Sequence, residues 1–119
     1  MNTTICRETL HTLYGSMNED VIDFFSEFII VYPEFKSQCL ESYRQNDLEG
    51  LKKALHQHAP GFTYVGFPGL TQGMKELEMN CSKASSVAEI KIQFQEVMFM
   101  ADGAANEVKK ELNTLRPVQ

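Results

Sequence analysis

Residues 48–66 read LEGLKKALHQHAPGFTYVG, and the fold prediction depends on this stretch. Its apolar side chains recur at steps of three and four residues, which places them in one stripe along a helix. We therefore predict an amphipathic helix whose stripe faces a hydrophobic core. The stripe consists of Leu48, Leu51, Leu55, Ala59 and Phe62.

Two histidines in the second half of this helix are predicted to have different surroundings. At about 100° per residue, with Leu48 at zero, the apolar stripe centres at about 320°. His56 falls at about 80°, well off the stripe, and should project into solvent. His58 falls at about 280°, on the buried side. We interpret His56 as the reactive group and His58 as a core or boundary residue.

The rest of the chain predicts further helices joined by short connections. Gly15 ends a short first helix, and Asn18 begins a long second one whose apolar phase continues across Pro33, which indicates one kinked helix. Pro68 suits the first turn of another helix, and the capping box at residues 86–89 begins the last. The predicted fold is all-α: an antiparallel up-down-up-down four-helix bundle with an additional short N-terminal helix, in one domain over residues 1–119.

Composition excludes several classes of function. The net charge is −5, and a nucleic-acid footprint or an acidic membrane surface would select a dense basic face. The longest apolar run, residues 28–32, is far too short to span a membrane, and the first residues show no export signal. Cys6, Cys39 and Cys81 are odd in number and widely spaced, which is typical of reduced thiols. We expect a cytoplasmic protein that binds neither nucleic acid nor membrane.

The spacing around His56 resembles that of a histidine-containing phosphotransfer (HPt) domain. The family pattern has a Gly or Pro four residues after the histidine, a Gly at the tenth place, an apolar residue four later and then a Leu-Glu pair. Here these places hold Pro60, Gly66, Leu70 and residues 77–78. The upstream segments 13–15, 18–20, 24–28 and 32–35 resemble the opening helices of the family. The resemblance spans about residues 8–115.

The resemblance implies a phosphocarrier in a two-component phosphorelay. His56 would accept a phosphoryl group from the aspartate of a receiver domain, or from a hybrid sensor histidine kinase, and pass it to a response regulator. The receiver would supply Mg²⁺ and most of the acceleration, so this chain would hold no cofactor and would not itself be an enzyme. We expect it to be a monomer.

The sequence departs from the family pattern at one position. The family has a lysine three residues after the histidine, and this position is Ala59 here. Lys52 and Lys53, one turn before His56, are predicted to support the phosphoryl group instead. Small side-chain volume beside the histidine predicts that a partner approaches over Pro60, Gly61 and Thr63.

Alternative readings remain open from sequence alone. Metal binding by the H-x-H at residues 56–58 is disfavoured, because residues two apart on a helix point about 200° apart; we predict no metal site. The missing lysine favours a second possibility, an HPt-like module that docks kinases or receivers without carrying phosphate. A helical interaction or structural protein is the third.

Overall fold

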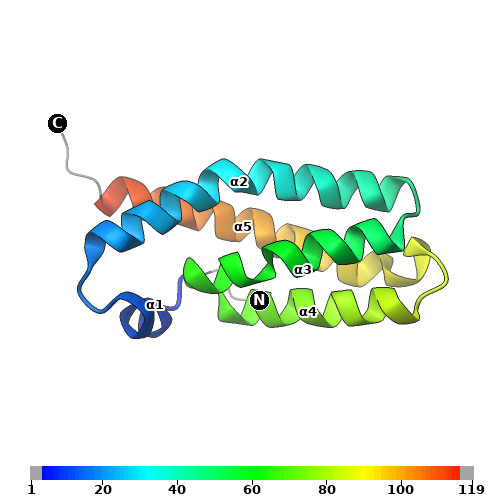
Figure 1. Ribbon diagram of the computed structural model, residues 1–119, viewed down its shortest axis with the longest axis horizontal. Helices are drawn as coiled ribbons and strands as arrows, with labels where there is room; N and C mark the ends of the chain where they lie inside the picture. Colours follow the sequence, from blue (N-terminus) through cyan, green and yellow to red (C-terminus); the bar gives the residue numbers. More distant parts are fainter. Residues whose placement is uncertain (1–3, 116–119) are drawn as a thin grey trace.

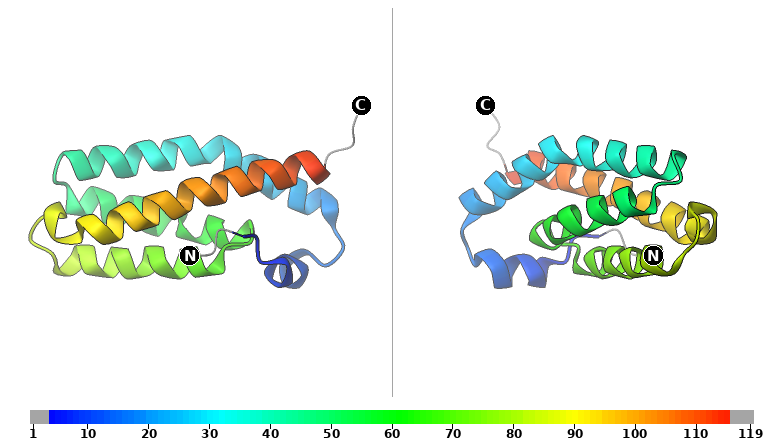
Figure 2. Two further views of the ribbon diagram at one scale, coloured as in Figure 1. Left: turned by 180° about the vertical axis from the view of Figure 1, so that it is seen from behind. Right: turned by 45° about the vertical axis from the view of Figure 1, so that its right-hand side comes forward.

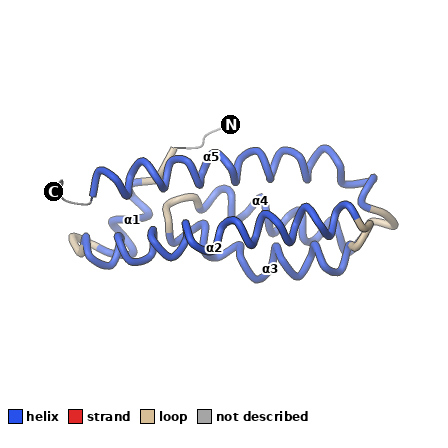
Figure 3. The backbone as a smooth tube through the Cα atoms, turned by 90° about the horizontal axis from the view of Figure 1, so that it is seen from above, coloured by secondary structure: helices blue, strands red, loops and turns tan. Residues whose placement is uncertain are grey.

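The computed structural model describes residues 4–115, and the regular elements within this range are all helices. Figure 3 shows the long helices lying roughly along one axis. The predicted all-α bundle is confirmed; residues 1–3 and 116–119 of the predicted domain lie outside the described range. The elements are α1 (Arg7–Tyr14), α2 (Asn18–Arg44), α3 (Leu48–Tyr64), α4 (Pro68–Lys83), the 3₁₀ turn η1 (Val87–Ile90) and α5 (Lys91–Leu115).

Helices α2 to α5 form the bundle, and the short α1 packs at one end of it. In Figure 1 α3 and α4 lie side by side in front, with α2 above them and α5 behind. Seen from behind in Figure 2, α5 crosses the bundle between α2 and α4. Three residues connect α2 to α3 and α3 to α4, and seven residues that include η1 connect α4 to α5, so consecutive helices run antiparallel.

One hydrophobic cluster fills the space between the four helices. Phe25, Phe35 and Phe62 are almost completely buried in it, and the rings of Phe35 and Phe62 meet edge to face with centroids 5.5 Å apart. Burying a side chain of this size stabilises a fold by about 1.5–3 kcal/mol. Cys39 and Cys81 are also buried and serve as small core residues.

Local sequence signals set the helix ends. α2 runs without interruption through Pro33, as the continuous apolar phase predicted. Asp47 caps α3 by accepting a hydrogen bond from the Gly50 N–H at 2.9 Å. In the capping box, the carboxylate of Glu89 accepts a hydrogen bond from the N–H of Ser86. This capping box begins the 3₁₀ turn η1, which then leads into α5. The last helix therefore starts one tight turn later than the periodicity indicated.

Polar contacts fix α1 against the end of the bundle. The Tyr14 hydroxyl donates to the Tyr64 carbonyl at 2.7 Å, and the Cys6 N–H donates to the Gly66 carbonyl at 2.7 Å. Gly66 has a φ of +98°, a conformation that side chains rarely adopt. A Cβ at this position would also lie 2.8 Å from Cγ2 of Ile5. Glycine is therefore required where α3, α4 and the N-terminal segment meet.

We predict that Gly66→Ala lowers the free energy of unfolding by about 1–3 kcal/mol, because it adds backbone strain and a clash with Ile5. Urea denaturation at neutral pH measures the change. Gly73→Ala on α4 is the control: a Cβ there meets nothing within 4 Å, so alanine should leave stability unchanged or raise it by up to about 1 kcal/mol. Equal stability of the two variants would contradict the role assigned to Gly66.

Candidate functional site at the α3–α4 seam

His56 projects from α3 into solvent, with 80% of its side chain exposed. Leu55 precedes His56 on α3, and Ala59 follows it by three residues. Both are buried in the core and hold the helix in this rotation. The imidazole is therefore accessible to a partner along the edge where α3 meets α4. We call this edge the α3–α4 seam; it is formed by Lys52, His56 and Thr63 of α3 and by Thr71 and Glu78 of α4.

A carboxylate from α4 stands beside the imidazole. Nδ1 of His56 lies 3.3 Å from Oε2 of Glu78, whose side chain is mostly buried. A carboxylate at this nitrogen favours the proton on Nδ1, and Nε2 then carries the free electron pair. Sequence reasoning noted Glu78 only as part of a Leu-Glu pair and missed this contact, because no local pattern reports which residues face each other across two helices.

Two threonines connect α3 and α4 about two turns beyond His56. The Thr63 hydroxyl donates to the Thr71 hydroxyl at 2.7 Å, and the Thr71 hydroxyl donates to the Ala59 carbonyl at 2.9 Å. Thr71 is buried, and these bonds satisfy its hydroxyl. The half-buried Thr63 thus directs its hydroxyl toward α4, and its role on the surface that a partner approaches stays a prediction.

The two lysines before His56 lie on different sides of α3. Lys52 pairs with Glu49 at 3.5 Å on the α4 side, where its charge also acts on Cys81. Burial raises the pKa of the Cys81 thiol, and Lys52 opposes that rise. Lys53 instead lines a shallow hollow between α3 and α2, together with residues such as Glu41. Lys52 therefore shares the seam with His56, and Lys53 does not.

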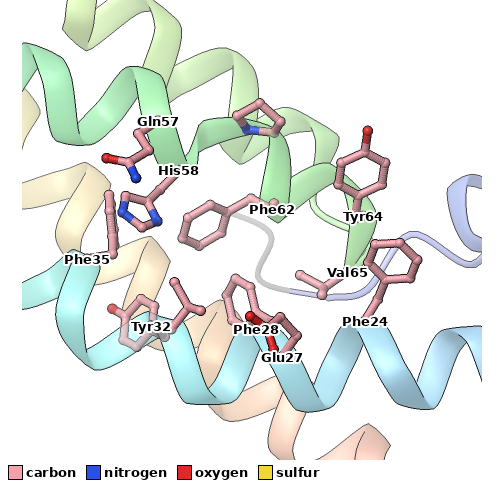
Figure 4. Close-up of a pocket in the computed structure, with 13 residues that line it drawn as sticks. Phe24, Glu27, Phe28, Tyr32, Phe35, Gln57, His58, Phe62, Tyr64 and Val65 are labelled. Atoms are coloured by element: carbon pink, nitrogen blue, oxygen red, sulfur yellow. The ribbon is translucent and has the colours of Figure 1, made fainter.

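Pro60 and Gly61 border a second feature, a cavity of about 320 Å³ between α2 and α3. Figure 4 shows its aromatic walls and His58 pointing into it. The surface over Gly61 is open, since a Cβ there would meet nothing within 4 Å. The aromatic residues lining the cavity are Phe24, Phe28, Tyr32, Phe35, Phe62 and Tyr64.

His58 occupies this cavity with an unsatisfied polar atom. Its Nε2 is buried without a hydrogen-bond partner, and its ring packs against Phe35 with centroids 5.2 Å apart. Burial lowers the pKa of His58, and the charge of Glu34 opposes this shift. His58 is therefore held neutral on the inner side of α3, turned away from His56.

The described residues contain neither a metal-binding cluster nor a membrane-spanning helix. Within residues 4–115 there is no group of three His, Cys, Asp or Glu side chains that could hold a metal ion. None of the helices in that range is long and apolar enough to cross a membrane.

Comparison with known proteins supports one fold family. The structure is similar to the crystal structure of the HPT domain from the Hpt sensor hybrid histidine kinase from Shewanella, with a TM-score of 0.85. The two sequences are 16% identical, and the match covers 97% of this chain and 98% of that chain. No protein-family model and no curated protein matches the sequence. The chain therefore has the fold of an HPt domain, as the sequence predicted.

We predict that His58→Leu raises the free energy of unfolding by about 1 kcal/mol at pH 7.5, because an apolar side chain replaces a buried nitrogen without a partner. The gain should grow as pH falls. Below the ordinary histidine pKa of 6.5, the unfolded wild-type chain binds a proton that folded His58 resists, so wild-type stability falls with pH.

Urea denaturation of both proteins at pH 7.5 and 5.5 measures this difference. His11→Gln, at an exposed position on α1, is the control and should leave the wild-type pH dependence in place. A His58→Leu protein that loses as much stability between the two pH values as wild type would contradict the prediction.

Proposed function

We propose that this protein is a histidine phosphotransfer protein of a two-component phosphorelay, with His56 as the phosphorylated residue. The observation that carries the proposal is an exposed imidazole on α3 of an HPt fold, with its Nδ1 held beside Glu78. A nucleophile for phosphoryl transfer must be exposed and must have one nitrogen free, and His56 meets both conditions.

The proposed step follows from this geometry. The Nε2 electron pair attacks the phosphorus of a receiver's aspartyl phosphate and forms an N–P bond. The P–O bond to the aspartate breaks, and its electron pair returns to the carboxylate. The ring then carries a positive charge with its proton still on Nδ1, and the adjacent Glu78 carboxylate stabilises it. The reverse sequence delivers the group to a response regulator.

The receiver would contribute the rest of the machinery. Phosphoryl transfer depends mainly on positioning and on neutralising charge, and the receiver is proposed to bring Mg²⁺ along with its aspartate. This chain then acts as a phosphocarrier, requires no cofactor of its own and is not an enzyme. Its proposed partners are receiver domains and a hybrid sensor histidine kinase, met in the cytoplasm by a monomer.

The approach surface of the receiver is proposed to run over Pro60 and Gly61 toward the aromatic cavity between α2 and α3. Phe24 and Tyr64 are stacked at its rim with centroids 5.5 Å apart, and both are more than 40% exposed. Exposed aromatic surface of this kind is typical of protein interfaces. Thr63 contributes to this approach indirectly, by fixing α3 against α4.

A second candidate function is docking without phosphate transfer. The observation that favours it is the charge around His56, where the Glu78 carboxylate stands close and position 59 is a buried alanine. A dianionic phosphoryl group would be repelled by this carboxylate. The two functions differ in outcome: a carrier gains a phosphoryl group from a charged receiver, and a docking module binds it and stays unmodified.

We predict that a receiver phosphorylated with acetyl phosphate transfers an acid-labile, base-stable phosphoryl group to the wild-type protein. His56→Gln should reduce the transferred label to background, because glutamine keeps the polarity and removes the nucleophile. His58→Gln is the matched control two residues away and should remain labelled. Label that persists in His56→Gln, or binding without label in wild type, would reject His56 as the carrier.

We further predict that replacing Lys52 and Lys53 together by Gln slows transfer by about tenfold, since a charge-assisted hydrogen bond contributes about 1.5–3 kcal/mol. Most of the loss should come from Lys52→Gln, because Lys52 lies at the seam. Rapid-quench kinetics with the phosphorylated receiver measures it. A double variant as fast as wild type would remove both lysines from the mechanism.

A further inference from the structure

The register of α3 against α4 places a third lysine at the seam. His56 lies opposite Glu78, and Thr63 lies opposite Thr71, so each step forward on α3 matches one step back on α4. On this register, position 59 of α3 lies opposite Lys75 of α4. Lys75 is thus at the level of the helix turn that follows His56.

Lys75 also lies on the side of α4 that faces α3. It comes four residues after Thr71 and three before Glu78, and residues at these spacings share one side of a helix. Both of those residues contact α3. Lys75 itself is exposed, at the outer edge of this face, so its long side chain is free to lie along the seam. Lys83, two turns further along α4, instead borders a hollow with η1 and the start of α5.

The charged side chains along the seam do not form an ion pair with Lys75. A phosphoryl group on Nε2 of His56 would bring about two negative charges close to the Glu78 carboxylate. Lys52, on one side of His56, is paired with Glu49. On the other side Ala59 is 2% exposed and offers neither charge nor bulk. Among residues 4–115, Lys75 forms no ion pair.

We infer that Lys75 binds the phosphoryl group carried by His56, donating hydrogen bonds from its ammonium to the phosphoryl oxygens across the space above Ala59. The inference rests on the proposed function and adds a residue to that same site. Lys75 keeps its proton throughout; it offsets the repulsion from Glu78 while the N–P bond forms and while it breaks. With Lys52 it brackets His56 along the seam.

The test compares single-charge variants of one helix. Wild type, Lys75→Gln, Lys75→Arg and Lys83→Gln are mixed with a receiver phosphorylated by acetyl phosphate, and transfer to His56 and back is followed by rapid quench. We expect Lys75→Gln to slow phosphoryl transfer to His56 and back by about tenfold. The rate of Lys75→Arg should stay within about threefold of wild type. Lys83→Gln should transfer at the wild-type rate. Lys83→Gln removes the same charge from the same helix, away from the seam.

A relocation variant separates charge from local structure. In the double variant Ala59→Lys, Lys75→Gln, the ammonium reaches the same level of the seam from α3, and we expect most of the lost rate to return. Thermal unfolding followed by circular dichroism shows whether each variant keeps the wild-type fold. No recovery in a double variant that folds as wild type does would overturn the inference.

Two further outcomes have distinct meanings. Transfer by Lys75→Gln at the wild-type rate, or an equal loss in Lys83→Gln, would overturn the role of Lys75 while His56 still becomes labelled. A wild-type protein that takes no phosphoryl group from any receiver of a panel would overturn the proposed function, and the inference with it.

Discussion

The rotation of α3 about its own axis is the constraint on which the rest of this structure depends. Leu51, Leu55 and Phe62 are at most 1% exposed, and together they press one stripe of the helix into the core. Turning the helix by a single residue position, about 100°, would expose several of these side chains, and each would forgo about 1.5–3 kcal/mol of burial. His56 remains outside because the stripe cannot leave the interior.

The contacts across the α3–α4 seam define the chemical environment of His56. The two threonine bonds fix the axial position of one helix against the other, and the same register brings Glu78 to Nδ1 of His56. The environment at the imidazole is therefore set by packing several residues away. The proposed phosphorylation site needs no pocket, since 80% of the His56 side chain is exposed and a partner can supply the opposite wall.

The sequence predicted those features that are encoded within one helix. Periodicity located the helices, Pro68 marked the start of one of them, and the angular position of His56 followed from its own helix alone. Features that depend on two helices were not predictable in this way. The contact of Glu78 with His56 requires the register between α3 and α4, which no local pattern contains.

Two residues show the limit more sharply. Thr63 falls near the outer flank of α3, yet its hydroxyl turns inward because Thr71 of α4 offers a buried partner. His58 was correctly expected at the boundary of the core, but nothing in the sequence indicated that its Nε2 would lack a hydrogen-bond partner. Such details arise from the shapes of neighbouring side chains, and only a three-dimensional structure contains them.

The contacts of α1 have a consequence for motion within α3. The last carbonyls of a helix have no partner in the helix itself, and here the Tyr14 hydroxyl of α1 donates to the carbonyl of Tyr64, the last residue of α3. The Cys6 N–H, just before α1, donates to the carbonyl of Gly66 in the loop that follows α3. These hydrogen bonds oppose fraying of the final turn of α3, which adjoins Pro60 and Gly61. Amide hydrogens in that turn should consequently exchange slowly with solvent for as long as α1 stays docked, so the order of the surface beside His56 is tied to a helix that lies at the far end of the bundle.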